Sequence, residues 1–266
     1  MKDNNDPIKQ ENKKALPKFI LMSVGGLVVG LILGVFLVFL DDMNLSDALT
    51  AAGRFFTIHA APWLLIALPF AELALCLPIY FSANKQFKGW DGEDETFSNE
   101  IETKLSVGIW LTGLATILDF FLAAALFSGF LDMEGNPARV APVSFFGGLG
   151  AFLVTLYVSA VLQQKIVDAT KRLNPEKHGS VYDTKFQKKW LESCDEAERA
   201  IIGQCAMKAY QAVTITCLAL WAVLGLGGMF FSWGFMPAMT VCIVWGVSQS
   251  VYCYWCIKLS KPGSAL

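Results

Sequence analysis

The chain has 266 residues, 55% of them hydrophobic and 13% aromatic, and a net charge of −2. This is more apolar surface than a soluble core of this size usually buries. The near-neutral charge argues against a nucleic-acid partner, because phosphate binding needs a concentrated basic face. Composition therefore predicts a membrane protein whose main partner is the lipid bilayer.

Six apolar stretches are each long enough to cross a bilayer as an α-helix. A hydrocarbon core about 30 Å thick takes roughly 20 helical residues, and backbone amides in lipid must be satisfied within the segment. We place the crossings at 19–40, 60–83, 105–130, 143–167, 205–231 and 236–257. The predicted fold is all-α: a polytopic membrane protein with six transmembrane helices, forming a single integral membrane domain over 1–266.

The first crossing follows a polar head, residues 1–18. Because the apolar stretch is too long for a signal peptide and has no small-residue cleavage site, we expect it to stay in the mature protein. Gly26 and Gly30 have the small-xxx-small spacing that allows a homodimer, although glycines are also simply tolerated in membrane helices. Residues 41–57 are then predicted to form a loop and a short amphipathic helix on the membrane surface.

Prolines and a turn mark the later crossings. Pro62, Pro69 and Pro78 fall in the second crossing, which we expect to be kinked or partly unwound. Only a short turn, 232–234, separates the last two crossings, so these are predicted to form an antiparallel hairpin.

Basic residues indicate the orientation. Of the 21 Lys and Arg residues, only Arg54 and Arg139 fall in the predicted outer loops. The positive-inside rule therefore places both termini in the cytoplasm, together with two amphipathic connectors, 84–104 and 168–204. No cysteine falls in an outer loop. The CxxC at 253–256 lacks the second ligand pair that zinc needs, so we predict no metal site.

The two connectors resemble one another weakly. Trp90 and then acidic residues precede the third crossing, and Trp190 and then acidic residues precede the fifth. We interpret residues 60–130 and 143–231 as an internal two-helix repeat with parallel copies. Convergence of two unrelated segments on acidic helix starts is the alternative.

Acidic residues open the helices that lead back into the membrane. These are Asp94, Glu95, Asp195, Glu196 and Glu198, with Glu102 further along the first of the two helices. Asp and Glu in a first turn offset the helix dipole, worth about 0.3–1 kcal/mol each, which is a purely structural explanation. The functional alternative is that they converge into a cytoplasmic site for a cation or a partner protein.

The second connector has the most distinctive sequence, LNPEKHGSVYDTKF at 173–186 and KKWLESCDEAE at 188–198. Helical spacing from Asp183 to Ala197 predicts an amphipathic helix on the inner leaflet. Its contacts with lipid headgroups or a partner would be Lys185, Lys188, Lys189 and Trp190. These motifs and the six-helix layout resemble the domain-of-unknown-function 3169 family, multi-pass membrane proteins of Gram-positive bacteria. The resemblance implies a bacterial plasma membrane and carries no assigned activity.

Two carboxylates fall inside predicted crossings: Glu72 in the second and Asp119 in the third. A charge at mid-bilayer costs about 2.5–3.5 kcal/mol on insertion scales, so such groups normally face a cavity or a partner. Because the two crossings run in opposite directions, the carboxylates could lie at similar depth and share a proton or bind a cation. The alternative is that each is protonated and hydrogen-bonded, with no role in transport.

The motifs that would identify an enzyme are absent from the sequence. It contains no HExxH, no GxSxG and no nucleotide-binding loop, so we predict no enzyme, no catalytic residue and no cofactor. The preferred function is transport-related, as a small transporter or as a membrane component or accessory of an export system. An ATP-driven role would need a separate ATPase or other membrane subunit. The alternative is a non-catalytic regulatory or scaffold protein that binds a partner through its cytoplasmic connectors.

Overall fold

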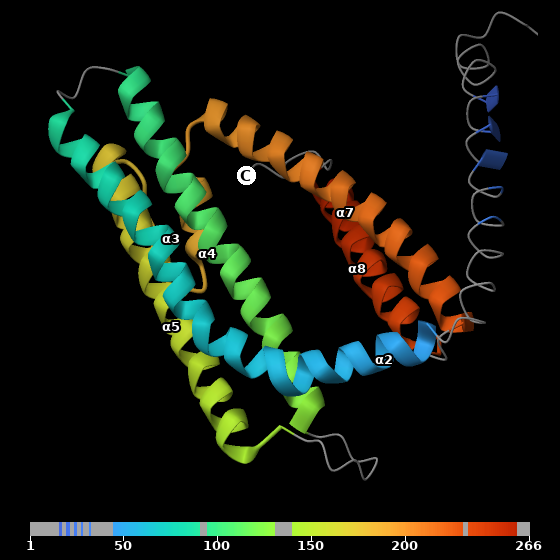
Figure 1. Ribbon diagram of the computed structural model, residues 1–266. Coiled ribbons are helices and arrows are strands. Elements are labelled where there is room, and N and C mark those ends of the chain that lie inside the picture. Colours follow the sequence, from blue (N-terminus) through green and yellow to red (C-terminus); the bar gives the residue numbers. More distant parts are fainter. Residues whose placement is uncertain are drawn as a thin grey trace, which may run out of the picture. The chain divides into compact units, whose positions relative to one another are not determined.

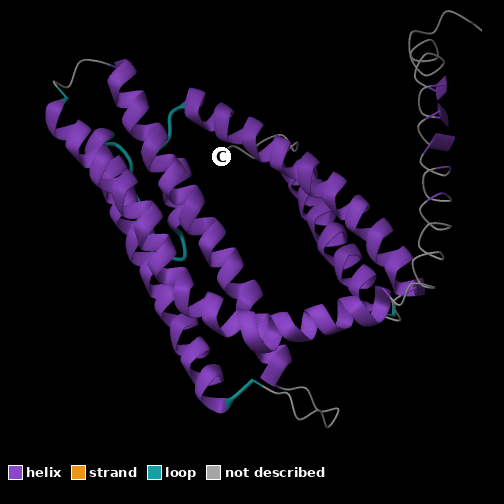
Figure 2. Ribbon diagram, in the orientation of Figure 1, coloured by secondary structure: helices purple, strands orange, loops and turns teal. Residues whose placement is uncertain are grey.

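Every element described in the computed structural model of this protein is a helix (Figure 2). The structure describes residues 45–90, 95–130, 140–230 and 234–259, together with scattered positions between 16 and 32. Among these residues, five helices are long and apolar enough to cross a membrane. The predicted first crossing, 19–40, lies mostly outside the described residues, so the count of six stays a prediction.

The elements in chain order are α2 (Leu45–Phe55), the π-helical turn η1 (Phe56–Ala60), α3 (Ala61–Gly89), α4 (Glu95–Phe130), α5 (Pro142–Leu173), α6 (Phe186–Glu192), α7 (Glu196–Phe230) and α8 (Met236–Leu259) (Figure 1). Helices α3, α4, α5, α7 and α8 correspond to the other five predicted crossings. Several of them extend past the predicted limits at their polar ends. Hydropathy marks where apolar side chains stop, whereas backbone hydrogen bonds continue into the polar residues.

The helices belong to two compact units, Thr50–Gln204 and the combination of Met1–Leu49 with Cys205–Leu266. In the first unit α3, α4 and α5 form a three-helix bundle in which each helix contacts the other two (Figure 1). Two apolar clusters hold this bundle. One contains Leu65, Leu126 and Phe145, and the other contains Ala83 and Ile166, with each helix contributing to both clusters. The order of these contacts along the chain makes α4 antiparallel to α3 and α5.

The second crossing is predicted to be kinked or partly unwound. The unwinding is wrong, whereas the kink stays a prediction. Helix α3 is continuous through Pro69 and Pro78. Pro62 is the second residue of α3, which directly follows the π-helical turn η1. The irregular backbone lies just before it, in η1, which joins α3 to α2. Helix α2 confirms the short helix predicted within 41–57.

The second unit contains the predicted hairpin of the last two crossings, which is confirmed. The rings of Tyr210 on α7 and Tyr252 on α8 stack with centroids 4.7 Å apart. The Tyr210 hydroxyl also donates a hydrogen bond to Gln249 of α8. Gly234, at the start of the return, has φ +68°, a left-handed conformation that glycine adopts without strain. The remainder of the predicted turn, 232–233, lies outside the described residues.

The connections within the two copies of the proposed repeat differ. Helix α3 ends at Gly89 and α4 begins at Glu95, so the first connector is mostly helix. Helices α5 and α7 are instead joined by a folded segment that contains α6. The internal repeat therefore stays a prediction.

Candidate functional site

A layer of buried polar side chains lies between the two apolar clusters of the bundle. Glu72 of α3 and Asp119 of α4 are 3% and 0% exposed, and Thr155 and Ser159 of α5 are 0% and 3% exposed. Both carboxylates lie on the helix stripes that face the neighbouring helices, because buried residues recur around them at intervals of three, four and seven positions. Packing of the three helices therefore places two acids and two hydroxyls inside one bundle, whose helices are long and apolar enough to cross a membrane.

Glu72 is bonded through only one of its carboxylate oxygens. Its Oε1 accepts a hydrogen bond of 2.7 Å from the Ser159 hydroxyl, which connects α3 directly to α5. Its Oε2 is buried and has no hydrogen-bond partner among the described residues. The carboxyl group is thus fixed in position while half of its bonding capacity stays unused.

Both carboxylate oxygens of Asp119 are buried, and neither accepts a hydrogen bond from a described residue. Thr155 lies beside Asp119. The Thr155 hydroxyl, however, donates to the Ala151 carbonyl of its own helix at 3.1 Å, as helical threonines commonly do. Asp119 is also close enough to Glu72 for the charge of one to act on the other. A buried carboxyl without partners is costly, so this site favours an added proton or cation.

Sequence reasoning identified the two acids but missed their α5 neighbours. Thr155 and Ser159 belong to a stripe of α5 that also contains Phe145, Gly148 and Leu162, all buried. Helical spacing along 145–162 is the signal that could have placed these hydroxyls on an inward face.

The part of the predicted second connector that lies between α5 and α7, residues 174–195, folds differently from the prediction and is called the connector below. The expected helix from Asp183 to Ala197 is wrong, because α6 ends at Glu192 and a new helix, α7, begins at Glu196. Asp195 and Glu198 cause this break by forming a capping box. The Glu198 N–H donates to Asp195 Oδ1 at 2.8 Å, and the Asp195 N–H donates to Glu198 Oε2 at 2.9 Å. The Arg199 guanidinium donates to the carbonyls of Leu191 and Glu192, the last two residues of α6.

Two of the predicted acidic helix-start residues therefore have a structural role. Asp195 and Glu198 satisfy backbone N–H groups of the first turn, and Glu196 beside them is exposed. Asp94 lies outside the described residues, as does the side chain of Glu95. The capping geometry favours the helix-start explanation over a shared cation site for the α7 residues.

Lys177 is the residue of the connector whose burial the sequence did not predict. It is only 5% exposed, and its ammonium donates hydrogen bonds to Glu198 and to the Cys194 thiol, the latter at 3.8 Å. Burial by itself lowers the pKa of Lys177, but the hydrogen bond to Glu198 and nearby negative charge raise it by more. The net shift is upward, so Lys177 is charged at neutral pH. Burial also raises the pKa of the Cys194 thiol, which stays protonated.

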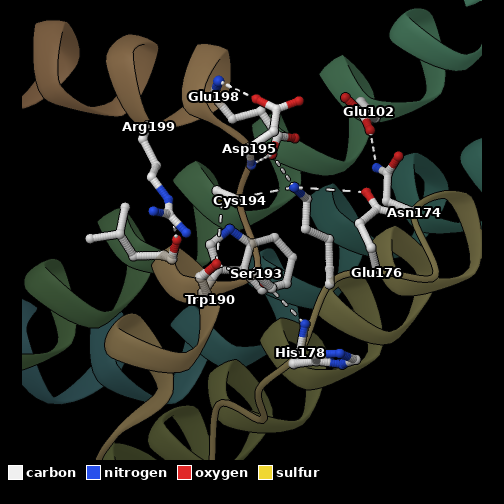
Figure 3. A network of polar contacts seen from close by, with 12 residues as sticks. Glu102, Asn174, Glu176, His178, Trp190, Ser193, Cys194, Asp195, Glu198 and Arg199 are labelled. Carbon is white, nitrogen blue, oxygen red and sulfur yellow. Dashed lines mark hydrogen bonds and ion pairs between the residues drawn. The ribbon is translucent and has the colours of Figure 1, made fainter. Parts of the chain in front are cut away.

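A cavity of about 340 Å³ beside this ion pair is lined by residues of α4, α5, α6 and α7. Glu102 and Glu198 both line it, so part of the predicted convergence of acidic residues does occur. Each of the two is already bonded. Asn174 donates to Glu102 (Figure 3), and Lys177 donates to Glu198. The contacts fasten the connector to the bundle and leave no free pair of carboxylates for a cation.

The four predicted surface-contact residues lie on or next to α6. Lys189 is paired with Asp183, whose pKa this hydrogen bond lowers below its usual value. Lys188 lies 3.7 Å from Glu192, and Lys185 is exposed. Trp190 is half-buried and packs on Phe186 with ring centroids 5.6 Å apart. The three lysines are therefore exposed on or next to α6, whereas Trp190 lines the cavity beside Lys177.

Cys253 and Cys256 are exposed on α8 and form no disulfide with one another. Within the described part of the chain, no group of three or more His, Cys, Asp and Glu side chains is placed to hold a metal ion. Comparisons with protein-family models, with curated proteins and with solved structures gave no match. The resemblance to the domain-of-unknown-function 3169 family therefore stays a prediction, and the geometry of the two regions is what bears on function.

Proposed function

We propose that the chain is a transport-related protein of a bacterial plasma membrane, with six crossings and both termini in the cytoplasm. Its α3–α4–α5 bundle would carry an intramembrane carboxyl site that takes up a proton or another cation. The observation that carries the proposal is Asp119, fully buried with neither carboxylate oxygen hydrogen-bonded among the described residues. An ionisable group at membrane depth without a partner is typical of proton and ion pathways.

The electrostatic environment supports the same role. Two carboxyl groups in one buried layer oppose simultaneous ionisation, because like charges in a low dielectric repel strongly. Glu72 is held by Ser159 on α5, whereas Asp119 has no such hydrogen bond. Asp119 is thus the group freer to exchange its proton, with Glu72 as a fixed neighbour whose charge biases it.

Proton movement through the purified protein tests this proposal without knowledge of any further substrate. The protein is reconstituted into liposomes that contain a pH-sensitive dye, and a membrane potential is imposed. We expect proton entry with the wild type and its loss with Asp119→Asn. Asp168→Asn is the matched control, because Asp168 lies near the end of α5 and is bonded to Gln164 and Lys171. Equal proton entry with Asp119→Asn and the wild type would refute the proposal.

The folded second connector favours one alternative, a scaffold that binds a partner on its α6 surface. Residues 174–195 are held by the buried Lys177 and by Gln164 of α5, which accepts hydrogen bonds from Ser180 and Val181. Such order is suited to a docking surface. Purification of the tagged protein in a mild detergent, followed by identification of co-purifying proteins, distinguishes the two. A scaffold would recover a partner, such as an ATPase subunit, and lose it when Lys188 and Lys189 are replaced by glutamate.

A further inference from the structure

Thr155 of α5 lies opposite Asp119 of α4 because of the register in which these two helices pack. The helices are antiparallel, and Gly148 of α5 lies against Leu126 of α4. Thr155 comes seven residues after Gly148, and Asp119 comes seven residues before Leu126. Seven residues are close to two turns of an α-helix, so both side chains lie on the same contact face as the glycine and the leucine.

A second contact places the same two residues opposite one another from the other end of the bundle. Gly108 of α4 lies against Ile166 of α5. Asp119 comes eleven residues after Gly108, and Thr155 comes eleven residues before Ile166, a spacing close to three helical turns. Both side chains are fully buried, and Thr155 is near enough to act on the Asp119 carboxyl group. Packing on either side therefore holds the two residues together.

The two hydroxyls of the buried polar layer are used differently. Ser159 donates to Glu72 at 2.7 Å and fixes that carboxyl group in position. Thr155 donates instead to the Ala151 carbonyl at 3.1 Å. That carbonyl also accepts the backbone N–H of Thr155 within α5, so it keeps a partner when the hydroxyl turns away. The Thr155 hydroxyl is therefore available to Asp119 at little cost.

We propose that Thr155 is a positioning residue of Asp119, and that its hydroxyl reverses its hydrogen bond when Asp119 exchanges a proton. Protonated Asp119 would donate to Thr155 Oγ1, which still donates to the Ala151 carbonyl. After Asp119 has released its proton, the Thr155 O–H would rotate and donate to the carboxylate, because a hydroxyl can both accept and donate. Thr155 keeps its own proton throughout. The inference rests on the proposed function, for which it names the residue that regulates proton release.

The rotation of the Thr155 hydroxyl would favour the ionised form of Asp119. Within the described part of the bundle, Glu72 of α3 is the one charged group found to act on Asp119, and α5 places hydroxyls beside these acids. The charge of Glu72 opposes ionisation of Asp119. A hydrogen bond to a carboxylate is stronger than one to a backbone carbonyl, so donation by Thr155 would offset part of this repulsion.

Proton entry into liposomes, measured with the full chain as above, tests the role of the hydroxyl. Thr155→Val keeps the shape of the side chain and should lower proton entry at least about tenfold, as expected for loss of a hydrogen bond to a charged group. Thr155→Ser keeps the hydroxyl and should retain most of the activity. Thr170→Val is the matched control, because Thr170 of α5 also donates to a carbonyl of its own helix at 3.1 Å. It lies about four turns from Thr155 and should conduct like the wild type.

Infrared spectroscopy of the same samples measures the hydrogen bond itself, which a purely structural role of Thr155 would leave unchanged. The C=O stretch of protonated Asp119 is identified as the band that Asp119→Asn removes. Thr155→Val should shift this band because the carboxyl group loses its acceptor, whereas Thr155→Ser and Thr170→Val should leave it in place. Thr155→Ala gives the same comparison if Thr155→Val fails to fold. An unshifted band, or equal loss of proton entry in the valine and serine variants, would overturn the proposal.

Failure of this inference can be separated from failure of the proposed function. Loss of proton entry in Asp119→Asn, together with wild-type proton entry in Thr155→Val, overturns the Thr155 assignment alone. Unchanged proton entry in Asp119→Asn overturns the proton site, whereas the position of the infrared band still tests the hydrogen bond between Thr155 and Asp119.

Discussion

Replacing Glu198 by glutamine should loosen the second connector, because Lys177 would stay buried without its main partner. The Lys177 side chain is 5% exposed, and that of Glu198 is 38% exposed. The remaining carboxylate, Glu176, lies 3.8 Å away and is 58% exposed, so water screens it. Glutamine keeps the capping contact with the Asp195 N–H, so the substitution removes mainly the charge.

The magnitude follows from the exposure of the pair. Two unit charges 4 Å apart attract by about 4 kcal/mol at an effective dielectric of about 20. Loss of one partner from a fully buried pair costs about 3–5 kcal/mol. Because Glu198 is more than one-third exposed, water screens the pair, and we expect the free energy of local opening of the connector to fall by only about 2 kcal/mol. A change of this size corresponds to about 30-fold faster amide exchange.

Hydrogen–deuterium exchange of peptides from residues 174–195, resolved by mass spectrometry, measures this opening directly. Glu196→Gln is the control, since Glu196 is an exposed residue of the same helical turn, and we expect a change below about 0.5 kcal/mol. The double variant Lys177→Met/Glu198→Gln should recover at least half of the lost protection, because no charge is then buried. Equal exchange in Glu198→Gln and Glu196→Gln, or no recovery in the double variant, would refute the reasoning.

Three further predictions concern the bundle and the connector. Gly129→Ala should destabilise the bundle by about 1–3 kcal/mol, because its Cβ would lie 3.0 Å from a backbone carbonyl oxygen of η1. Ser159→Ala should cost about 1–3 kcal/mol by leaving Glu72 with no hydrogen bond. The pKa of Asp183 is lowered in the folded chain, so its stabilising effect is present above its unfolded pKa of about 3.9 and disappears as pH falls through the folded pKa. Protection of the connector against hydrogen exchange should decrease over that acidic range.

Each of these predictions has a matched control. The effects of Gly129→Ala and Ser159→Ala are measured as changes in the free energy of unfolding, in mixed micelles that contain a denaturing detergent. Gly113→Ala has open space around the new Cβ and should stabilise by up to about 1 kcal/mol, so equal effects at Gly129 and Gly113 would contradict the packing argument. Thr170→Val removes a hydroxyl that donates only to a carbonyl of its own helix, and it should cost less than Ser159→Ala. The acid-dependent loss of connector protection should be absent in Asp183→Asn.

The sequence by itself determined that the chain forms helices long and apolar enough to cross a membrane, and where five of them lie. Stretches of about 20 apolar residues can satisfy their backbone only as helices in lipid. The predicted crossings at 60–83 and 143–167 accordingly lie within α3 and α5. The helix ends were predicted less well, because the helices continue into polar residues that hydropathy counts as loop. In α4, for example, Lys104 and Glu100 form a 2.7 Å ion pair one helical turn apart, which stabilises the helix beyond its apolar stretch.

Tertiary structure alone decided how the polar groups are paired. Glu72 and Asp119 could be selected from the sequence because charges inside apolar stretches are rare. The environment of the two carboxyl groups could not be predicted from the sequence, because it depends on how α5 is rotated about its own axis. That rotation packs Gly148 against Leu126 and brings Ser159 to Glu72. That rotation is a property of three packed helix surfaces and of no single segment.

The connector shows the same division. Its turn residues and acidic helix start were visible in the sequence, but the periodic pattern from Asp183 to Ala197 predicted one helix where the chain forms two. Lys177 gave no signal of its own, because it becomes a buried partner of Glu198 only when the loop folds back on α7. Local sequence thus determined which segments are helical, whereas contacts between residues distant in the chain determined which charges are buried and which remain without a partner.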